Sequence, residues 1–506
     1  MGQEIAREAF SQEDHARFRK RLEQGLEVLR RLVARPDFGV GPRSVGVELE
    51  LSLIDARGAP LPVNQAVLQE TLDPRFTFEL NRFNLECNLH PTPLEGRPFA
   101  ALQEQLSEAL SELARAAAVH SGRIVSIGIL PTLRAEHLRA SAMTDSARYR
   151  VLAAALRRIR ARPFALRIEG QDALAIDTED ITFEGAATSL QLHIRVSPGE
   201  FDAAFNAAQL ATAPALAVAC NSPIFLGRQL WEETRIALFR QAADDRTHAE
   251  QLQHAPPRVG FGERWIDGGA VELFESANAY EVLLPQVGAE DPMEALRAGA
   301  TPRLDELRLH QGTVWSWNRP VYDPAGRGHL RIELRALPAG PSVCDMLANM
   351  AFLVGLTYAL KSSAHVWTRR LSFEAAEQNF YRAAQRGLEA RLWWFGASDE
   401  AEPRLVPATV LVQELLPLAR AGLESAGVEP SDSAPWLDII RARCSSAQTG
   451  ASWQRATLRA LETQGLSRAA ALAILLARYT EQVEADRPVH TWPIEAYERG
   501  PQKAHA

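Results

Sequence analysis

Apolar and polar residues alternate most clearly along residues 44–54. Every second residue from Val45 to Leu51 is apolar, and the positions between them include Glu48 and Glu50. Successive side chains of a strand point to opposite faces, so the two glutamates share one face of the predicted strand. Two neighbouring carboxylates repel each other. This face therefore needs an explanation beyond ordinary contact with water.

Three further stretches, 81–90, 188–197 and 329–337, show the same two-sided pattern, with one face apolar. Their polar faces carry Asn84, Glu86, Asn88 and His90; Ser189, Gln191, His193 and Arg195; and His329, Arg331, Glu333 and Arg335. For any single strand, a solvated face explains such residues. Four strands with the same bias favour one sheet, whose polar faces combine into a concave surface.

Helical spacing of apolar residues predicts helices over 12–35, 98–119, 147–162 and 201–219, and an almost wholly helical region from 342 to about 485. Further strands are expected at 76–90, 123–132, 164–168 and 173–184. Strands and helices do not alternate regularly. This order favours an α+β fold with an antiparallel sheet and helices on one side of it.

Composition narrows the class of protein. The net charge of −8 over 506 residues argues against sequence-independent nucleic-acid binding, which needs a basic surface. The four cysteines are far apart and form no CxxC pair, which is typical of a reducing compartment. No apolar signal region occurs in residues 1–35, and the apolar stretch 347–360 is shorter than a membrane span. We expect a cytoplasmic protein that does not bind membranes.

Converging carboxylates need a compensating charge, and oxygen ligands in this number select Mg²⁺ or Mn²⁺. Arginines beside them suit phosphate or carboxylate groups. Together they predict a phosphoryl-transfer site, although no GxxxxGK[ST] or GxGxxG loop occurs. Glu79 joins this site only if the chain turns between Glu79 and Glu86. An ion pair with a nearby arginine is the equally weighted alternative for Glu79.

The order of these motifs resembles glutamate–cysteine ligase family 2, the carboxylate–amine ligases of glutamine-synthetase-like fold. The similar segments lie between about residues 43 and 362 and read VGVELEL, FELNRFNLECNLHPTP, TSLQLHIRV, CNSPIFLG and VWSWNRPVYDPAGRGHLRIELRALPAGPS. The resemblance implies an antiparallel sheet with a concave polar face. It also implies that ATP phosphorylates a substrate carboxylate, which an amine then attacks to give an amide, with Mg²⁺ ions bridging the phosphates.

Carried over by position, the resemblance implies metal ligands at Glu48, Glu50, Glu86, His193 and Glu333. It implies catalytic roles for Glu48, Glu333 and Arg335, with Arg335 stabilising the transferring phosphoryl group. The positions that would contact phosphate, nucleotide or substrate are Gln191, Asn221, Ser222, Arg319 and Arg331. Simpler structural roles are an Arg331–Glu333 pair, a helix cap at Asn221 and core positions for Trp315 and Trp317.

The expected layout is an N-terminal helical segment at 1–42, an ATP-dependent ligase domain at 43–365, a helical C-terminal region at 366–490 and a disordered tail at 491–506. The partners would be a glutamate-like acid and an amine such as cysteine or another amino acid, and formation of a homo-oligomer stays open. Two alternatives also stay open. One is a phosphotransferase of guanidino-kinase type on the same fold, and the other is a non-catalytic nucleotide-binding regulatory homologue.

Overall fold

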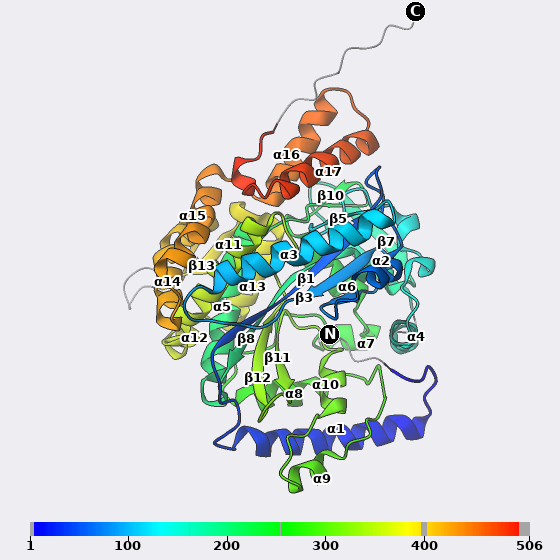
Figure 1. Ribbon diagram of the computed structural model, residues 1–506, viewed down its shortest axis with the longest axis vertical. Helices are drawn as coiled ribbons and strands as arrows, with labels where there is room; N and C mark the ends of the chain where they lie inside the picture. Colours follow the sequence, from blue (N-terminus) through cyan, green and yellow to red (C-terminus); the bar gives the residue numbers. More distant parts are fainter. Residues whose placement is uncertain (1–4, 161, 254, 396–401, 495–506) are drawn as a thin grey trace, which may run out of the picture.

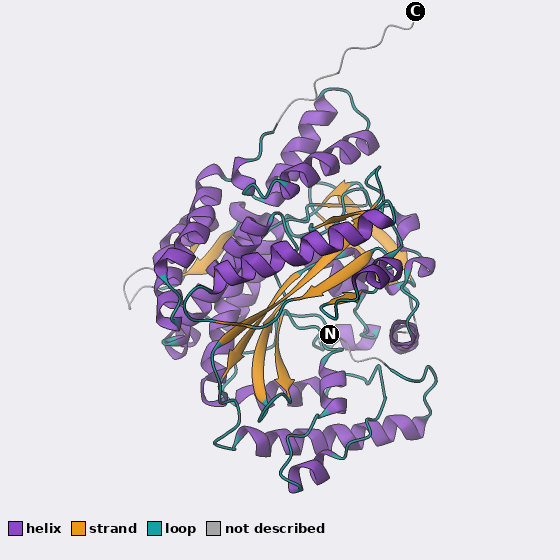
Figure 2. Ribbon diagram, in the orientation of Figure 1, coloured by secondary structure: helices purple, strands orange, loops and turns teal. Residues whose placement is uncertain are grey.

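The structure is a computed structural model that describes residues 5–160, 162–253, 255–395 and 402–494. A twisted sheet crosses the centre of the molecule, and helices lie around it (Figures 1 and 2). Most of the tail predicted at 491–506 lies outside the described residues. The helical N-terminal segment contains α1 (Gln12–Val33), which begins at Ser11 with a capping box.

The central sheet has the strand order β11-β12-β8-β1-β3-β2, and all of these pairs are antiparallel. Its strands are β1 (Ser44–Ile54), β2 (Phe76–Phe78), β3 (Asn84–Asn88), β8 (Leu190–Val196), β11 (Asn318–Asp323) and β12 (His329–Leu334), with β4 (Thr92–Pro93) and β5 (Arg123–Val125) also pairing with β1. The four strands with the unusual polar faces are therefore neighbours. The expected antiparallel α+β sheet is confirmed.

Several predicted strands are shorter than the sequence pattern indicates. The predicted strand 76–90 is interrupted, because the chain turns between Phe78 and Asn84. Of the apolar stretch 123–132, only β5 is a strand, and the stretch 173–184 leaves its strand at Thr178. Strand β11 was not predicted, because Pro320 interrupts its pattern. The smaller two-stranded pairs are β6 (Phe164–Glu169) with β7 (Ala173–Thr178), β9 (Ile224–Phe225) with β10 (Arg228–Gln229), and β13 (Arg391–Trp394) with β14 (Arg404–Pro407).

The apolar faces of the sheet share one buried core with α3 (Pro98–Val119), α5 (Phe201–Ala219) and α11 (Val343–Lys361). Among the described helices, α11 alone is long and apolar enough to cross a bilayer, but 94% of its most apolar window is buried inside the protein. It is therefore a core helix, as the sequence predicts. Helix α11 packs against both α5 and α14 (Ala408–Ala426).

The remaining α-helices lie beside the sheet or farther from it. They are α2 (Asn64–Thr71), α4 (Ala147–Arg160), α6 (Thr234–Ala242), α7 (His248–Leu252), α8 (Gly269–Ala277), α9 (Pro292–Arg297), α10 (Asp305–Gln311), α12 (Ala364–Arg370), α13 (Phe373–Arg386), α15 (Pro430–Ser446), α16 (Gly450–Thr463) and α17 (Arg468–Glu484). The C-terminal region is therefore mostly helical, with the β13–β14 hairpin as an exception. Helices α4, α8 and α10 supply residues to the cavity over the polar face of the sheet.

Candidate active site

The polar faces of the four strands form one wall of a cavity of about 420 Å³. Strand register explains the convergence, because Gly46, His193, Glu333 and Arg319 lie opposite one another across four adjacent strands. Nine of the residues predicted from the sequence line this cavity: Glu48, Glu50, Glu86, Gln191, His193, Arg319, Arg331, Glu333 and Arg335. The helices opposite the sheet contribute mostly apolar lining residues, among them Leu152, Leu156, Phe274 and Leu309.

Glu48, His193 and Glu333 form a group that fits a divalent cation. One ligand atom from each lies within 4.8 Å of the others. His193 Nε2 lies 3.1 Å from Glu48 Oε1, yet within the described residues neither ring nitrogen of this buried histidine makes a hydrogen bond of good geometry. The carboxylate oxygens suit Mg²⁺ or Mn²⁺, and the imidazole nitrogen is a common ligand of transition metals. The donor set therefore fits the metal that the sequence predicts.

Two arginines neutralise Glu333. Arg319 donates both to Glu333 Oε2 and, at 3.0 Å, to Glu333 Oε1. Arg335 donates to Glu333 Oε1 and also to Gln191 Oε1. Burial alone would raise the pKa of Glu333, but Arg319 and Arg335 hold this pKa well below its usual range. Glu333 is therefore ionised at any physiological pH, and the two guanidinium groups are fixed at the cavity wall.

A second acidic group lies beside the first and has less compensating charge. It consists of Glu50, Glu79, Glu86 and Glu184, which all line the cavity. Burial, followed by repulsion from Glu86, raises the pKa of Glu50 to about 7. Burial and then Glu50 raise the pKa of Glu184 to about 8, and burial with the neighbouring acids raises that of Glu79 well above its ordinary value. Converging acids of this kind fit a bound cation.

Hydrogen bonds hold the second group in position. Ser189 N–H donates to Glu50 Oε2 at 2.6 Å, and Gln191 Nε2 donates to Glu50 Oε1 at 2.8 Å. Asn88 Nδ2 donates to Glu86 Oε1 at 2.7 Å. These donors aim both carboxylates toward the same part of the cavity.

The structure answers the question about Glu79 and adds a residue that sequence reasoning missed. The turn between β2 and β3 brings Glu79 to the cavity with Glu86, as the alternative with a chain turn requires. Glu184 was missed because its segment was predicted to be a strand, whereas Ile181–Ala186 is a 3₁₀ helix. The only signal for Glu184 in the sequence is its place, since it is an acidic residue shortly before the strand that carries His193.

Asn221 and Ser222 do not line the cavity. Both are fully buried behind it, where Asn221 N–H donates to Glu233 Oε2 at 2.8 Å and Ser222 Oγ donates to Glu233 Oε1 at 2.5 Å. The expected contact with nucleotide or substrate is therefore corrected for these two residues, because other protein groups occupy their polar atoms.

Of the three other residues given simpler structural roles, two depart from them and one keeps its role. Arg331 lines the cavity and pairs with Asp323 at 3.3 Å, not with Glu333. Trp317 is a core residue that is 1% exposed, as expected. Trp315 instead lies at the cavity.

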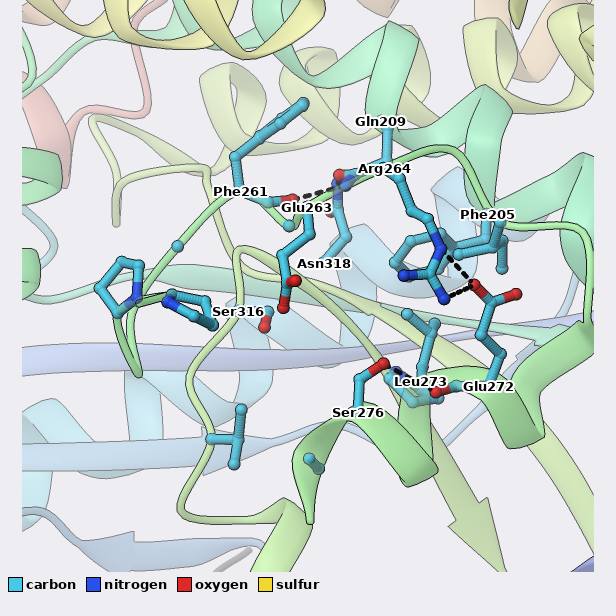
Figure 3. A pocket seen from close by; sticks show the side chains of 18 of the residues that line it. Phe205, Gln209, Phe261, Glu263, Arg264, Glu272, Leu273, Ser276, Ser316 and Asn318 are labelled. Atoms are coloured by element: carbon cyan, nitrogen blue, oxygen red, sulfur yellow. Dashed lines mark hydrogen bonds and ion pairs between the residues drawn. The ribbon is translucent and has the colours of Figure 1, made fainter. Parts of the chain in front are cut away.

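A second pocket, of about 90 Å³, lies near the start of β11 (Figure 3). Its polar groups are largely paired with one another. Arg264 Nε donates to Glu272 Oε1 at 2.9 Å, and the amide of Gln209 contacts Asn318 and the Phe261 carbonyl. Among its described residues it lacks the group of converging acids found in the larger cavity, so we assign the chemistry to the larger one.

The family model of glutamate-cysteine ligase family 2 (GCS2) matches residues 44–470. No curated protein matches the chain. A solved glutamate–cysteine ligase from Francisella tularensis, in complex with AMP, is 12% identical over 91% of each chain, with a TM-score of 0.55. A bifunctional glutathione synthetase from Pasteurella multocida is 15% identical over 93% of this chain and 54% of its own, with a TM-score of 0.48.

Proposed function

The chain belongs to glutamate–cysteine ligase family 2 and is an ATP-dependent ligase that forms carbon–nitrogen bonds, and from this premise we propose that it joins a small-molecule carboxylate to an amine through an acyl phosphate. The observation that carries this mechanism is the convergence of Glu48, Glu50, Glu86, His193 and Glu333 on one cavity, beside two fixed arginines. We propose a glutamate-like acid, with cysteine or another amino acid as the amine.

The acidic residues and the histidine would bind metal, and the arginines would bind phosphate. Glu48, His193 and Glu333 would hold one divalent cation, and Glu50, Glu86 and Glu79 a second. Mg²⁺ or Mn²⁺ bound there would neutralise negative charge on the ATP phosphates. Arg335 and Arg319 face the same space and would stabilise the transferring phosphoryl group through charged hydrogen bonds.

The reaction then proceeds in two displacements. A carboxylate oxygen of the acid attacks the γ-phosphorus of ATP, and ADP leaves. The neutral amine nitrogen next attacks the acyl carbon, phosphate leaves, and the nitrogen releases one proton to solvent as the amide forms. The apolar residues on the helical side of the cavity would exclude water, which otherwise hydrolyses the acyl phosphate. We propose that Arg331, which lines the cavity, binds a substrate carboxylate.

The test supplies purified protein with ATP, Mg²⁺ and matched panels of acids and amines, glutamate and cysteine included. We expect ADP and phosphate release that requires both an acid and an amine, and an amide product by mass spectrometry. A stable phosphorylated product without free phosphate would instead indicate the phosphotransferase. Metal-independent nucleotide binding without turnover would indicate a regulatory homologue.

A further inference from the structure

A buried hydrogen-bond network joins the C-terminal helices to the catalytic sheet. At its centre lies Asn221, whose Nδ2 donates to Tyr479 Oη of α17 and to the Ala339 carbonyl, both at 2.8 Å. Gln454 of α16 donates to Asn221 Oδ1 at 3.0 Å, and Tyr479 Oη donates to the Ser126 carbonyl at 2.8 Å. Asn221, Gln454 and Tyr479 are all 0% exposed. None of them lines the active-site cavity.

Packing around this network leaves no space for adjustment. A Cβ atom on Gly450, the first residue of α16, would lie 2.1 Å from Asn221 Oδ1. A Cβ atom on Gly340 would lie 2.2 Å from the Ser126 carbonyl oxygen and 3.0 Å from Tyr479 Oη, and Gly340 also has a φ of +76°. Both positions therefore need glycine, because the backbone approaches the network too closely for a side chain.

The segment held by Asn221 is the one that leads out of β12. Residues 336–339 directly follow Arg335 and run beside the start of β8, where Leu190 N–H donates to the Leu337 carbonyl at 3.0 Å. That part of β8 holds Glu50, through Ser189 N–H and Gln191 Nε2. The network therefore fixes a segment with active-site residues on both sides of it.

We propose that Tyr479 and Gln454 are positioning residues of the active site. Through Asn221 they hold segment 336–339, and this segment keeps the Arg335 guanidinium aligned with the cavity. The C-terminal helices are thus part of the catalytic unit, although they contribute no residue to the cavity wall. The activity measurement below rests on the proposed ligase function, whereas the exchange measurement does not.

The test compares full-length Tyr479→Phe with wild type. Removing the hydroxyl leaves one Asn221 N–H without its buried acceptor. We expect faster hydrogen–deuterium exchange at residues 188–191 and 333–339, outside α17 itself. We also expect kcat to fall by about tenfold while the KM for ATP stays within about twofold, since the change acts on phosphoryl transfer and not on nucleotide binding.

Thr480→Val is the matched control, because it removes a buried hydroxyl from the neighbouring position of α17. Thr480 Oγ1 donates only to the Leu476 carbonyl of its own helix, at 2.8 Å. We expect this variant to leave kcat and the exchange of 188–191 and 333–339 unchanged. If Tyr479→Phe does not fold, Gln454→Met removes the hydrogen bonds from Gln454 to Asn221 and should give the same two changes.

A double-mutant cycle tests whether the hydroxyl acts through Arg335. In an Arg335→Lys background, Tyr479→Phe should change kcat by less than about twofold. A full tenfold loss in that background, or exchange that rises only within α17, would overturn the proposal. Faster exchange at both segments in a protein whose wild type forms no amide would support the structural link and count against the proposed ligase function.

Discussion

Replacing Glu50 with glutamine should make the metal-free protein more stable at high pH while weakening its stabilisation by metal. Folding raises the pKa of Glu50 from its ordinary value of 4.5 to about 7, chiefly through burial and repulsion from Glu86. The folded protein therefore binds this proton more tightly than the unfolded chain, so metal-free stability falls as pH rises from about 4.5 to about 7. Above pH 7 the destabilisation is complete.

The size of this effect follows from the pKa. A tenfold change in proton affinity is worth about 1.4 kcal/mol, so a pKa raised from 4.5 to about 7 means that ionised Glu50 destabilises the metal-free fold by at most ~3.5 kcal/mol. Glutamine removes that repulsion but places an NH₂ group against the Ser189 N–H or the Gln191 amide, which costs ~1–2 kcal/mol. We expect Glu50→Gln to be more stable than wild type by ~1–2 kcal/mol at pH 8.5.

The assay is urea unfolding in EDTA at pH 8.5 and pH 5, repeated with excess Mn²⁺. At pH 5 Glu50 is protonated, so the advantage of the variant should disappear. Saturating Mn²⁺ should stabilise wild type, by ~2.7 kcal/mol at a hundred times Kd, and the variant much less. A variant that is less stable than wild type in EDTA at pH 8.5, and that Mn²⁺ stabilises equally, would refute the reasoning.

Further predictions concern the arginines and the metal. Glu333→Ala leaves Arg319 and Arg335, whose side chains are 15% and 13% exposed, without their carboxylate, so we expect unfolding to become easier by ~3–5 kcal/mol and turnover to be lost. Wild-type urea stability would contradict the ion pairs to the buried Glu333. Arg331→Ala breaks a pair whose side chains are 26% and 24% exposed, so stability should change by less than ~1 kcal/mol while the KM for the acid rises. An unchanged KM would exclude Arg331 from binding that substrate. EDTA should abolish ADP release and Mg²⁺ or Mn²⁺ restore it, whereas metal-independent release would contradict the metal site.

Strand alternation predicted the cavity wall because every second side chain of a strand lies on the same face of the sheet. The sequence placed Glu48, His193 and Glu333 each on a polar face, and the strand order and register of the folded sheet bring these faces together. The same reasoning failed where tertiary contacts override local pattern. Glu184 lies in a 3₁₀ helix, and Asn221 is positioned by residues more than two hundred positions away in sequence. The local pattern of apolar and polar residues in either segment does not predict these long-range contacts.

The C-terminal region shows the same limit at a larger scale. Its helical spacing predicts helices, and the structure has α14, α15, α16 and α17 there. Spacing alone does not state which helix touches the catalytic sheet. Only the fold shows that Gln454 and Tyr479 converge on Asn221.

The two acidic groups of the cavity differ in how much positive protein charge compensates them. This difference gives them different roles in metal binding. Glu333 is paired with Arg319 and Arg335 before any metal binds, so the first group is assembled in the free protein. Around Glu50, burial and repulsion between acids outweigh the nearby positive charge, as the raised pKa of this residue records. A cation at the second group therefore relieves repulsion that destabilises the metal-free fold. We expect metal binding there to be the step that is coupled to stability, and the paired glutamates of strand β1 belong one to each group.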